Sequence, residues 1–206
     1  LISEISRRVI EKNGYFISGK HDEIKRSVPY SSIIQALQKL VGELLSESED
    51  RITRWRELLR EALHDNGRVI TDVVPEIELI IGKQPEVIDL GPEASMNRIR
   101  LVFLNFIKAL ASEDHPLVLL IDDFQWADYA TMNLVKSIIE DGEMHNLLMV
   151  ISYRDNEPEK HLPQHEAINY IGNLDVSTHD IQMGPFDLDD TMRYVGCFLR
   201  KDMVEA

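Results

Sequence analysis

Apolar and polar residues follow a helical repeat over most of this chain. Apolar side chains that recur every three or four positions lie on one face of a helix, so each such stripe predicts an amphipathic helix. Serines at the start of one stripe, and Asp128 before another, are placed to cap the helices that follow. The stripes predict helices over 1–12, 31–46, 93–111, 129–140 and 189–201, with one more around Trp55 that ends before Gly67.

Four short runs depart from this repeat and predict strands. β-prone residues occupy 15–18 and 181–186, and continuous apolar runs occupy 117–123 and 147–152. Helical segments separate these runs, which implies crossover connections and a parallel sheet. The run at 117–123 shows no polar alternation, as is typical of a central strand that helices cover on both faces. Between 68 and 92, apolar pieces interrupted by prolines predict short helices and loops.

Composition limits the classes of protein to which the chain can belong. Its 206 residues, 44% of them hydrophobic, are enough for one globular domain with a sizeable core. The formal net charge of -14 argues against binding to nucleic acid or to an anionic membrane, because both need a basic surface. No apolar run approaches the ~20 residues of a membrane span. The single cysteine, Cys197, fits a cytoplasmic location and is expected to be packed in the core.

The stretch LVLLIDDFQWAD, residues 117–128, carries the candidate chemistry. Its apolar run ends at Asp122 and Asp123, and ligands of open parallel sheets bind at the carboxyl ends of the strands. In the Walker B motif of P-loop NTPases, the first acid holds Mg²⁺ and the second orients or deprotonates the attacking water. The alternative is a buried strand whose terminal acids bond to turn and helix-cap donors.

A nucleotide site also needs a phosphate-binding loop with the pattern GxxxxGK[ST]. One near match runs from Gly14 to His21, and we reject it. His21 replaces the hydroxyl that binds the metal, and Tyr15 to Ser18 favour an extended strand over a loop. The chain also begins at Leu1 within a helical stripe, so we expect it to be a fragment of a longer protein.

Four segments in order carry a family resemblance: YFISGKHDE, VPYSSIIQALQKLV, LVLLIDDFQWAD and VISYRDNE. Together they resemble the ATPase module of the STAND/AAA-type signalling ATPases, in the form found in bacterial hybrids between a serine/threonine-kinase-like domain and a sensor histidine kinase. The resemblance implies a P-loop NTPase-like three-layer α/β/α fold with a mainly parallel sheet. It also implies that the first strand and the P-loop are missing, and that they lie immediately upstream of Leu1.

The resemblance assigns roles to individual residues. Asp122 is implied to hold Mg²⁺, and Asp123 to be the neighbouring catalytic acid. Arg154 is implied to be the sensor arginine that binds the terminal phosphate of ATP; the alternative is an exposed loop arginine paired with Asp155. Two further groups of residues match patterns of the family. Gln125, Trp126 and Asp128 fit the pattern DD-x-QWAD, in which Trp126 is expected to be a packing anchor. Lys20, His21 and Asp22 fit the pattern GK-x-D, for which the sequence gives no role.

The resemblance also implies an organisation and a set of partners. The whole chain is expected to be one ATPase domain fragment, acting with kinase-like, GAF and histidine kinase domains of the same polypeptide, and capable of self-association. ATP and Mg²⁺ are the implied cofactors of the intact protein. The implied parts are a helix and second strand at 1–30, a helical insertion at 31–92, a Walker B and sensor core at 93–188, and the start of a helical part at 189–206.

Two hypotheses about function remain open at this stage. One is a regulatory ATPase module whose nucleotide state neighbouring signalling domains detect; the other is a non-catalytic scaffold for contacts between domains. A hydrolase that uses both Asp122 and Asp123 is disfavoured, because adjacent strand residues point to opposite faces. Without a P-loop, this chain is expected to bind MgATP weakly. The strand at 181–186 is then expected to pair with 147–152 or to be displaced, unless another chain fills the gap.

Overall fold

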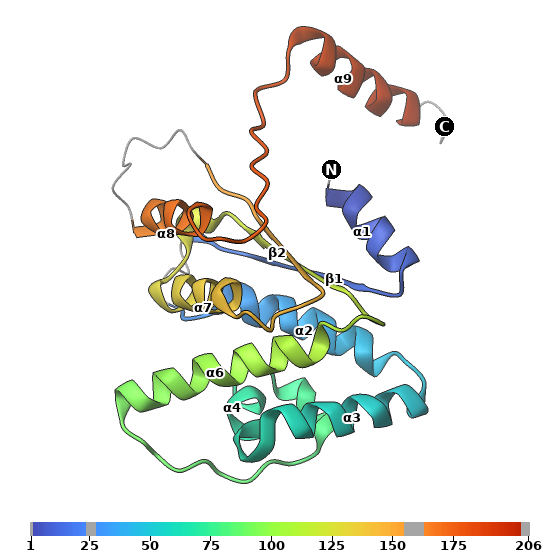
Figure 1. Cartoon of the computed structure of the whole chain (residues 1–206). Helices are drawn as coiled ribbons and strands as arrows, with labels where there is room; N and C mark the ends of the chain where they lie inside the picture. The colour runs from blue at the N-terminus through green and yellow to red at the C-terminus, as the bar shows by residue number, and fades with distance from the viewer. Residues whose placement is uncertain (1, 24–27, 155–162, 203–206) are drawn as a thin grey trace. The chain divides into compact units, whose positions relative to one another are not determined.

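The computed structural model describes residues 2–23, 28–154 and 163–202, and it contains a three-stranded parallel sheet (Figure 1). The strands are β1 (Tyr15–Lys20), β2 (Leu117–Asp122) and β3 (Leu147–Ile151), in the order β1-β2-β3. Three of the four predicted strands are therefore confirmed. All but the last residue of β2 are buried, as expected for the central strand. The α/β fold class predicted from the sequence is confirmed.

Helices account for most of the remaining chain, and they lie close to the positions that the apolar stripes predict. The short helices expected between 68 and 92 are present. The helices are α1 (Ile2–Glu11), α2 (Ser31–Leu45), α3 (Glu49–Leu63), α4 (Gly67–Thr71), α5 (Glu78–Ile81), α6 (Pro92–Leu110), α7 (Tyr129–Glu140), α8 (Pro163–Gly172) and α9 (Leu188–Asp202), with 3₁₀ turns η2 (His64–Asn66), η3 (Pro75–Ile77) and η4 (Phe124–Trp126).

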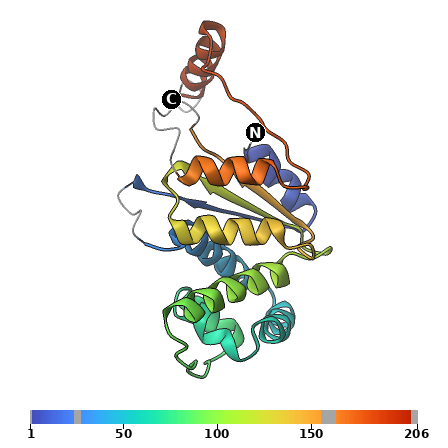
Figure 2. The ribbon, with the colours of Figure 1, turned by 60° about the vertical axis from the view of Figure 1, so that its left-hand side comes forward.

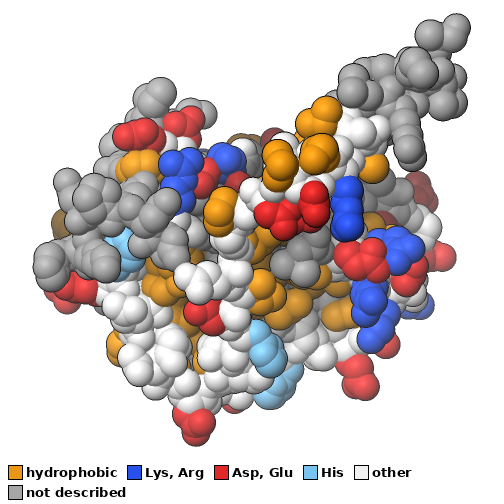
Figure 3. All heavy atoms as spheres, turned by 90° about the horizontal axis from the view of Figure 1, so that it is seen from above, with side chains coloured by type: hydrophobic (Ala, Val, Ile, Leu, Met, Phe, Trp, Pro, Cys, Tyr) orange, Lys and Arg blue, Asp and Glu red, His pale blue; other side chains and the backbone are white. Residues whose placement is uncertain are grey.

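Helices cover both faces of the sheet (Figures 1 and 2). Helices α2 and α7 lie on one face, α1 lies on the other, and α6 with the helical insertion forms a further layer beyond α2 and α7. Phe103 and Phe106 of α6 are fully buried in the core that joins these layers. On the side that carries α1, apolar side chains reach the surface (Figure 3). Leu148 of β3 is among the exposed large apolar residues of the molecule.

The start of α2 differs from the predicted serine cap. Tyr30, in the left-handed conformation with φ 60°, precedes the helix, and no side chain caps the first turn. Ser32 instead directs its hydroxyl toward the His21 ring, with 2.8 Å between Oγ and Nε2. The predicted cap of α7 is confirmed, because the Asp128 carboxylate accepts the Thr131 N–H at 2.9 Å.

Residues 175–206 form a unit separate from residues 1–174. The strand predicted at 181–186 is wrong, since these residues adopt no regular structure. Ile181, Met183 and Phe186 are exposed, and a β-prone run without a pairing strand has nothing to hold it extended. Cys197 is also exposed, which corrects the expectation that it packs in the core. No helix within the described residues is long and apolar enough to cross a membrane.

Candidate functional site

The acid pair lies where β1 and β2 both end, beside the segment that follows β3. The parallel register places Lys20, the last residue of β1, directly opposite Asp122. Ser152 follows the last residue of β3 and donates its backbone N–H to the Ile121 carbonyl at 3.0 Å. Because all three strands run in one direction, their carboxyl ends bring these polar side chains to one edge of the sheet.

The two acids point toward a common partner, contrary to the expectation from strand alternation. Asp122 ends β2 in extended backbone, but Asp123 adopts the left-handed conformation with φ 55° and ψ 46°. This turn rotates the Asp123 side chain back toward Asp122. The Lys20 ammonium contacts both carboxylates, at 2.8 Å from Asp123 Oδ2 and 3.4 Å from Asp122 Oδ2. The structure therefore brings the two predicted acids together in one cluster.

Ser152 fixes the orientation of the acid pair and was not predicted from the sequence. Its hydroxyl donates to Asp122 Oδ1, and its Oγ accepts the backbone N–H of Asp123 at 3.2 Å. Its carbonyl accepts the N–H of Phe124 at 2.9 Å. The segment after β3 thus holds the turn that carries both acids. The only sequence signal for this role is the position of a serine at the end of a predicted strand.

Gln125 connects the second acid to the sensor candidate. Its side chain is 1% exposed, and its amide nitrogen donates to Asp123 Oδ1 at 3.0 Å. Its amide oxygen accepts the backbone N–H of Arg154 at 3.2 Å. A single buried side chain thereby joins the end of β2 to the segment after β3. Arg154 itself is exposed, and Asp155, its proposed alternative partner, lies outside the described residues.

The surrounding charges favour the ionised form of Asp123. The hydrogen bond from the Lys20 ammonium is the largest influence that lowers the pKa of the Asp123 carboxyl, with smaller contributions from Gln125 and the Arg154 charge. Burial acts in the opposite direction, and the net pKa remains below the usual value. An ionised carboxylate at this position can accept hydrogen bonds from water or bind a cation.

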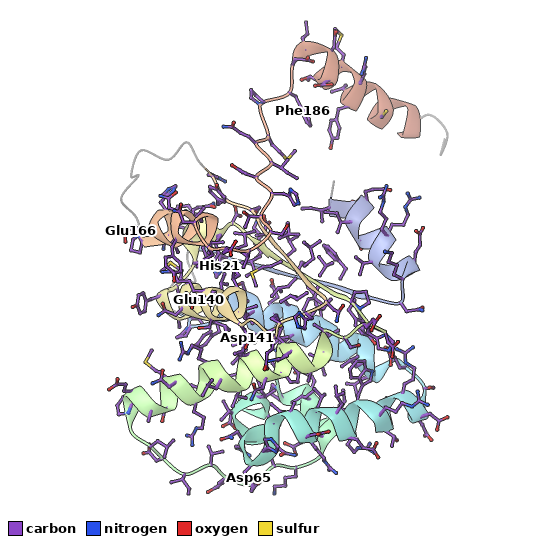
Figure 4. The ribbon with its side chains drawn as sticks, in the orientation of Figure 1. His21, Asp65, Glu140, Asp141, Glu166 and Phe186 are labelled. Atoms are coloured by element: carbon purple, nitrogen blue, oxygen red, sulfur yellow. The ribbon has the colours of Figure 1, made fainter. Side chains whose placement is uncertain are left out.

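His21 supports the site from the side of α2 (Figure 4). Its ring is 2% exposed, and burial lowers its pKa below the usual value, so the imidazole is favoured in its neutral form. Its backbone N–H donates to the Asp122 carbonyl at 3.0 Å. A cavity of about 510 Å³ opens beside it, lined by Lys20, His21, Asp22, Glu23, Ser31, Ile34, Gln35, Gln38, Asp123 and Trp126.

The residues present fit a magnesium–nucleotide site better than a metal cage made by protein alone. Magnesium in such sites binds one or two carboxylates, and it completes its shell with phosphate oxygens and water. Asp122 and Asp123 supply such carboxylates. Within the part of the chain that the structure describes, no group of three or more His, Cys, Asp or Glu residues could hold a metal ion.

A parallel sheet flanked by helices, with an acid pair at the carboxyl end of its central strand, defines an α/β domain of the P-loop NTPase-like class. A comparison with protein families agrees with this class. The family model described as "AAA ATPase domain" matches residues 1–151. The chain belongs to the AAA ATPase domain family.

Similar proteins are much longer than this chain. A relative named "Hybrid signal transduction histidine kinase G", from Dictyostelium discoideum, is 42% identical over 125 residues, which are 61% of this chain and 4% of that protein. "Histidine protein kinase 1" of Candida albicans (strain SC5314 / ATCC MYA-2876) is 22% identical over 148 residues, covering 62% of this chain and 6% of that protein. No solved structure matches the chain.

Replacing Gln125 with Leu tests its place in the site. We expect the free energy of unfolding to fall by about 1–3 kcal/mol, because the change leaves the Arg154 N–H and Asp123 Oδ1 without this partner. The measurement is urea unfolding of the 206-residue chain. Gln38→Leu is the matched control on the exposed face of α2, and it should change stability by less than about 0.5 kcal/mol. Equal effects of the two changes would contradict this interpretation.

Proposed function

We propose that this chain is part of the nucleotide-dependent regulatory module of a multi-domain signalling protein. It would supply the Walker B acids and the sensor arginine but not the phosphate-binding loop, and the intact protein would bind ATP with Mg²⁺. The observation that carries the proposal is the convergence of Asp122 and Asp123 at the carboxyl end of the central strand. Membership of the AAA ATPase domain family supports it. The names of the two relatives, both histidine kinases, support a signalling context.

Each residue has a defined role in this proposal. Asp122 would hold Mg²⁺, which when bound neutralises phosphate charge and polarises the terminal phosphoryl group. Asp123, kept ionised by its surroundings, would orient the attacking water by accepting its hydrogen bond. Arg154 would respond to the terminal phosphate, because a guanidinium can stabilise the charge that spreads over a departing phosphoryl group. Gln125 joins the backbone of this sensor to the Asp123 carboxylate.

The regulatory consequence follows from that connection. A ligand shifts a conformational equilibrium only to the extent that it binds the two states differently. A terminal phosphate that contacts Arg154 would bias the segment after β3, and this segment in turn holds both acids through Ser152 and Gln125. We propose that other domains of the same polypeptide, such as kinase-like, GAF or histidine kinase domains, respond to this bias.

Arg154→Ala tests the sensor role in the intact polypeptide. We expect affinity for the ATP–magnesium complex to fall roughly tenfold, because a charge-assisted hydrogen bond to phosphate is lost. Affinity for ADP should stay within about twofold, since ADP lacks the phosphate that this residue contacts. Fluorescence titration with labelled ATP and ADP measures both constants. Arg68→Ala is the control, because Arg68 belongs to the helical insertion and forms its ion pair there, with Asp72. Equal losses for ATP and ADP would count against the proposal.

The ion pairs of Lys20 favour a second candidate function, a non-catalytic scaffold for contacts between domains. The Lys20 ammonium forms ion pairs with both acids, which is an interaction that stabilises the fold by itself. A scaffold would retain this arrangement in every nucleotide state. Nucleotide affinity that does not change when Asp122 is replaced would favour the scaffold over the regulatory ATPase.

A further inference from the structure

Among the residues that the structure describes, Lys20 is the cation that forms ion pairs with both acids of the candidate site. Its side chain is 63% exposed, whereas those of Asp122 and Asp123 are 38% and 22% exposed. The ammonium is therefore open to solvent on one side and bound to the carboxylates on the other.

The backbone of Lys20 is fixed while its side chain extends into the site. Its N–H donates to Gln35 Oε1 of α2 at 2.9 Å, and the next residue donates its N–H to the Asp122 carbonyl at 3.0 Å. His21 also contacts Ser32 at the start of α2. These contacts hold the end of β1 from both sides. Movement of the ammonium then needs rotation of the side chain and loss of its ion pairs, and the backbone can stay in place.

The ammonium binds oxygens that a divalent cation would need. Two adjacent carboxylates repel each other, and a cation between them relieves this repulsion. An ammonium and a metal ion on the same carboxylate oxygens repel each other, and the other oxygen of each acid already accepts a hydrogen bond, from Ser152 or Gln125. The long, exposed side chain of Lys20 can move away from the two carboxylates, because a partly exposed ion pair is weak and is screened by salt.

We infer that Lys20 is an internal counter-cation of the acid pair, which a divalent metal ion has to displace when it binds Asp122 and Asp123. Lys20 is thus a positioning residue: it keeps the two carboxylates together in the metal-free protein and lowers their affinity for the metal. This inference rests on the proposed metal role of Asp122. It also gives the GK-x-D segment a function, in which His21 fixes the strand end and Lys20 supplies the charge.

Lys20→Met in the intact polypeptide tests this inference, with Mn²⁺ in the presence of ADP as the probe, because phosphate oxygens are needed to complete the shell of the metal. At low ionic strength the variant should bind Mn²⁺ about fivefold more tightly than the wild type, and the difference should shrink in high salt because ion pairs are screened. Lys20→Arg keeps the charge and should leave the affinity within about twofold of the wild type. Electron paramagnetic resonance of free Mn²⁺ measures the dissociation constants, and thermal unfolding checks that each variant is folded.

Two control variants separate displacement from a general effect of charge. Lys108 also pairs with two acids, Asp141 and Glu143, at the opposite end of α7 from the site. Lys39 donates to the carbonyl and hydroxyl oxygens of Ser18 on β1, two residues before Lys20, and among the described residues it forms no ion pair with either acid. Lys108→Met should not change Mn²⁺ affinity, and Lys39→Met should change it by less than Lys20→Met.

The outcomes separate this inference from the proposed function. If Asp122→Asn weakens Mn²⁺ binding but Lys20→Met leaves it unchanged or weaker, the proposed metal site stands and the counter-cation role is wrong. If Lys39→Met strengthens binding as much as Lys20→Met, displacement is also rejected. If no variant shows binding that depends on Asp122, the metal role of Asp122 fails and this inference fails with it.

Discussion

Gly19→Ala should lower the free energy of unfolding by about 3 kcal/mol or more, because overpacking against rigid backbone forces neighbouring elements apart. A Cβ atom at Gly19 would lie 1.7 Å from the Ser32 carbonyl oxygen and 2.5 Å from the Ser32 carbonyl carbon. Both atoms belong to the backbone of α2, so no side-chain rotation can relieve the clash. The first turn of α2 would have to move away from β1, and the contact between His21 and Ser32 would be lost.

Gly42→Ala is the matched control, because it makes the same chemical change within α2. No atom lies within 4 Å of a Cβ at Gly42, and the residue is exposed. Alanine is the better helix former by about 0.5–1 kcal/mol, so this variant should be as stable as the wild type or more stable. Urea unfolding of both variants gives the comparison. A Gly19→Ala protein with wild-type stability would show that α2 does not approach β1 this closely.

The helices and the sheet could largely be predicted because their signals are local. The stripe in α2, for example, buries Ile33, Leu37, Leu40 and Leu44, as its spacing requires. The placement of Asp122 at the edge of the sheet followed from a general rule about parallel strands. The strand at 181–186 was predicted from its composition alone. Strand formation depends on a pairing partner, which composition cannot supply.

The detailed geometry of the site could not be predicted, because it depends on contacts between distant segments. The two acids converge because the backbone of Asp123 is left-handed. Strand alternation had predicted that the Asp123 side chain would point to the opposite face of the sheet from Asp122. The Lys20 contact depends on the register between β1 and β2, which the sequence does not specify. Likewise, Ser152 and Gln125 act across segments about 30 residues apart, and neither belongs to a local pattern that indicates this pairing.

Asp122→Asn should reduce ATP hydrolysis by the intact polypeptide about 100-fold or more, because loss of a metal-binding carboxylate removes stabilisation of charge in the transition state. The substitution keeps the size of the side chain, and an amide oxygen can still accept the hydrogen bond from Ser152. The fold should therefore survive while the charge needed for Mg²⁺ is lost. Steady-state release of phosphate measures turnover, and urea unfolding of the 206-residue chain checks stability.

Asp141→Asn provides the control for this change, because Asp141 also pairs with a lysine but lies at the other end of α7 (Figure 4). Its turnover should equal that of the wild type. If Asp122→Asn hydrolyses ATP as fast as this control, the acid pair has a structural role, and the scaffold becomes the better description. If only Asp122→Asn loses turnover and output from neighbouring domains changes with it, the same carboxylate links metal binding to signalling.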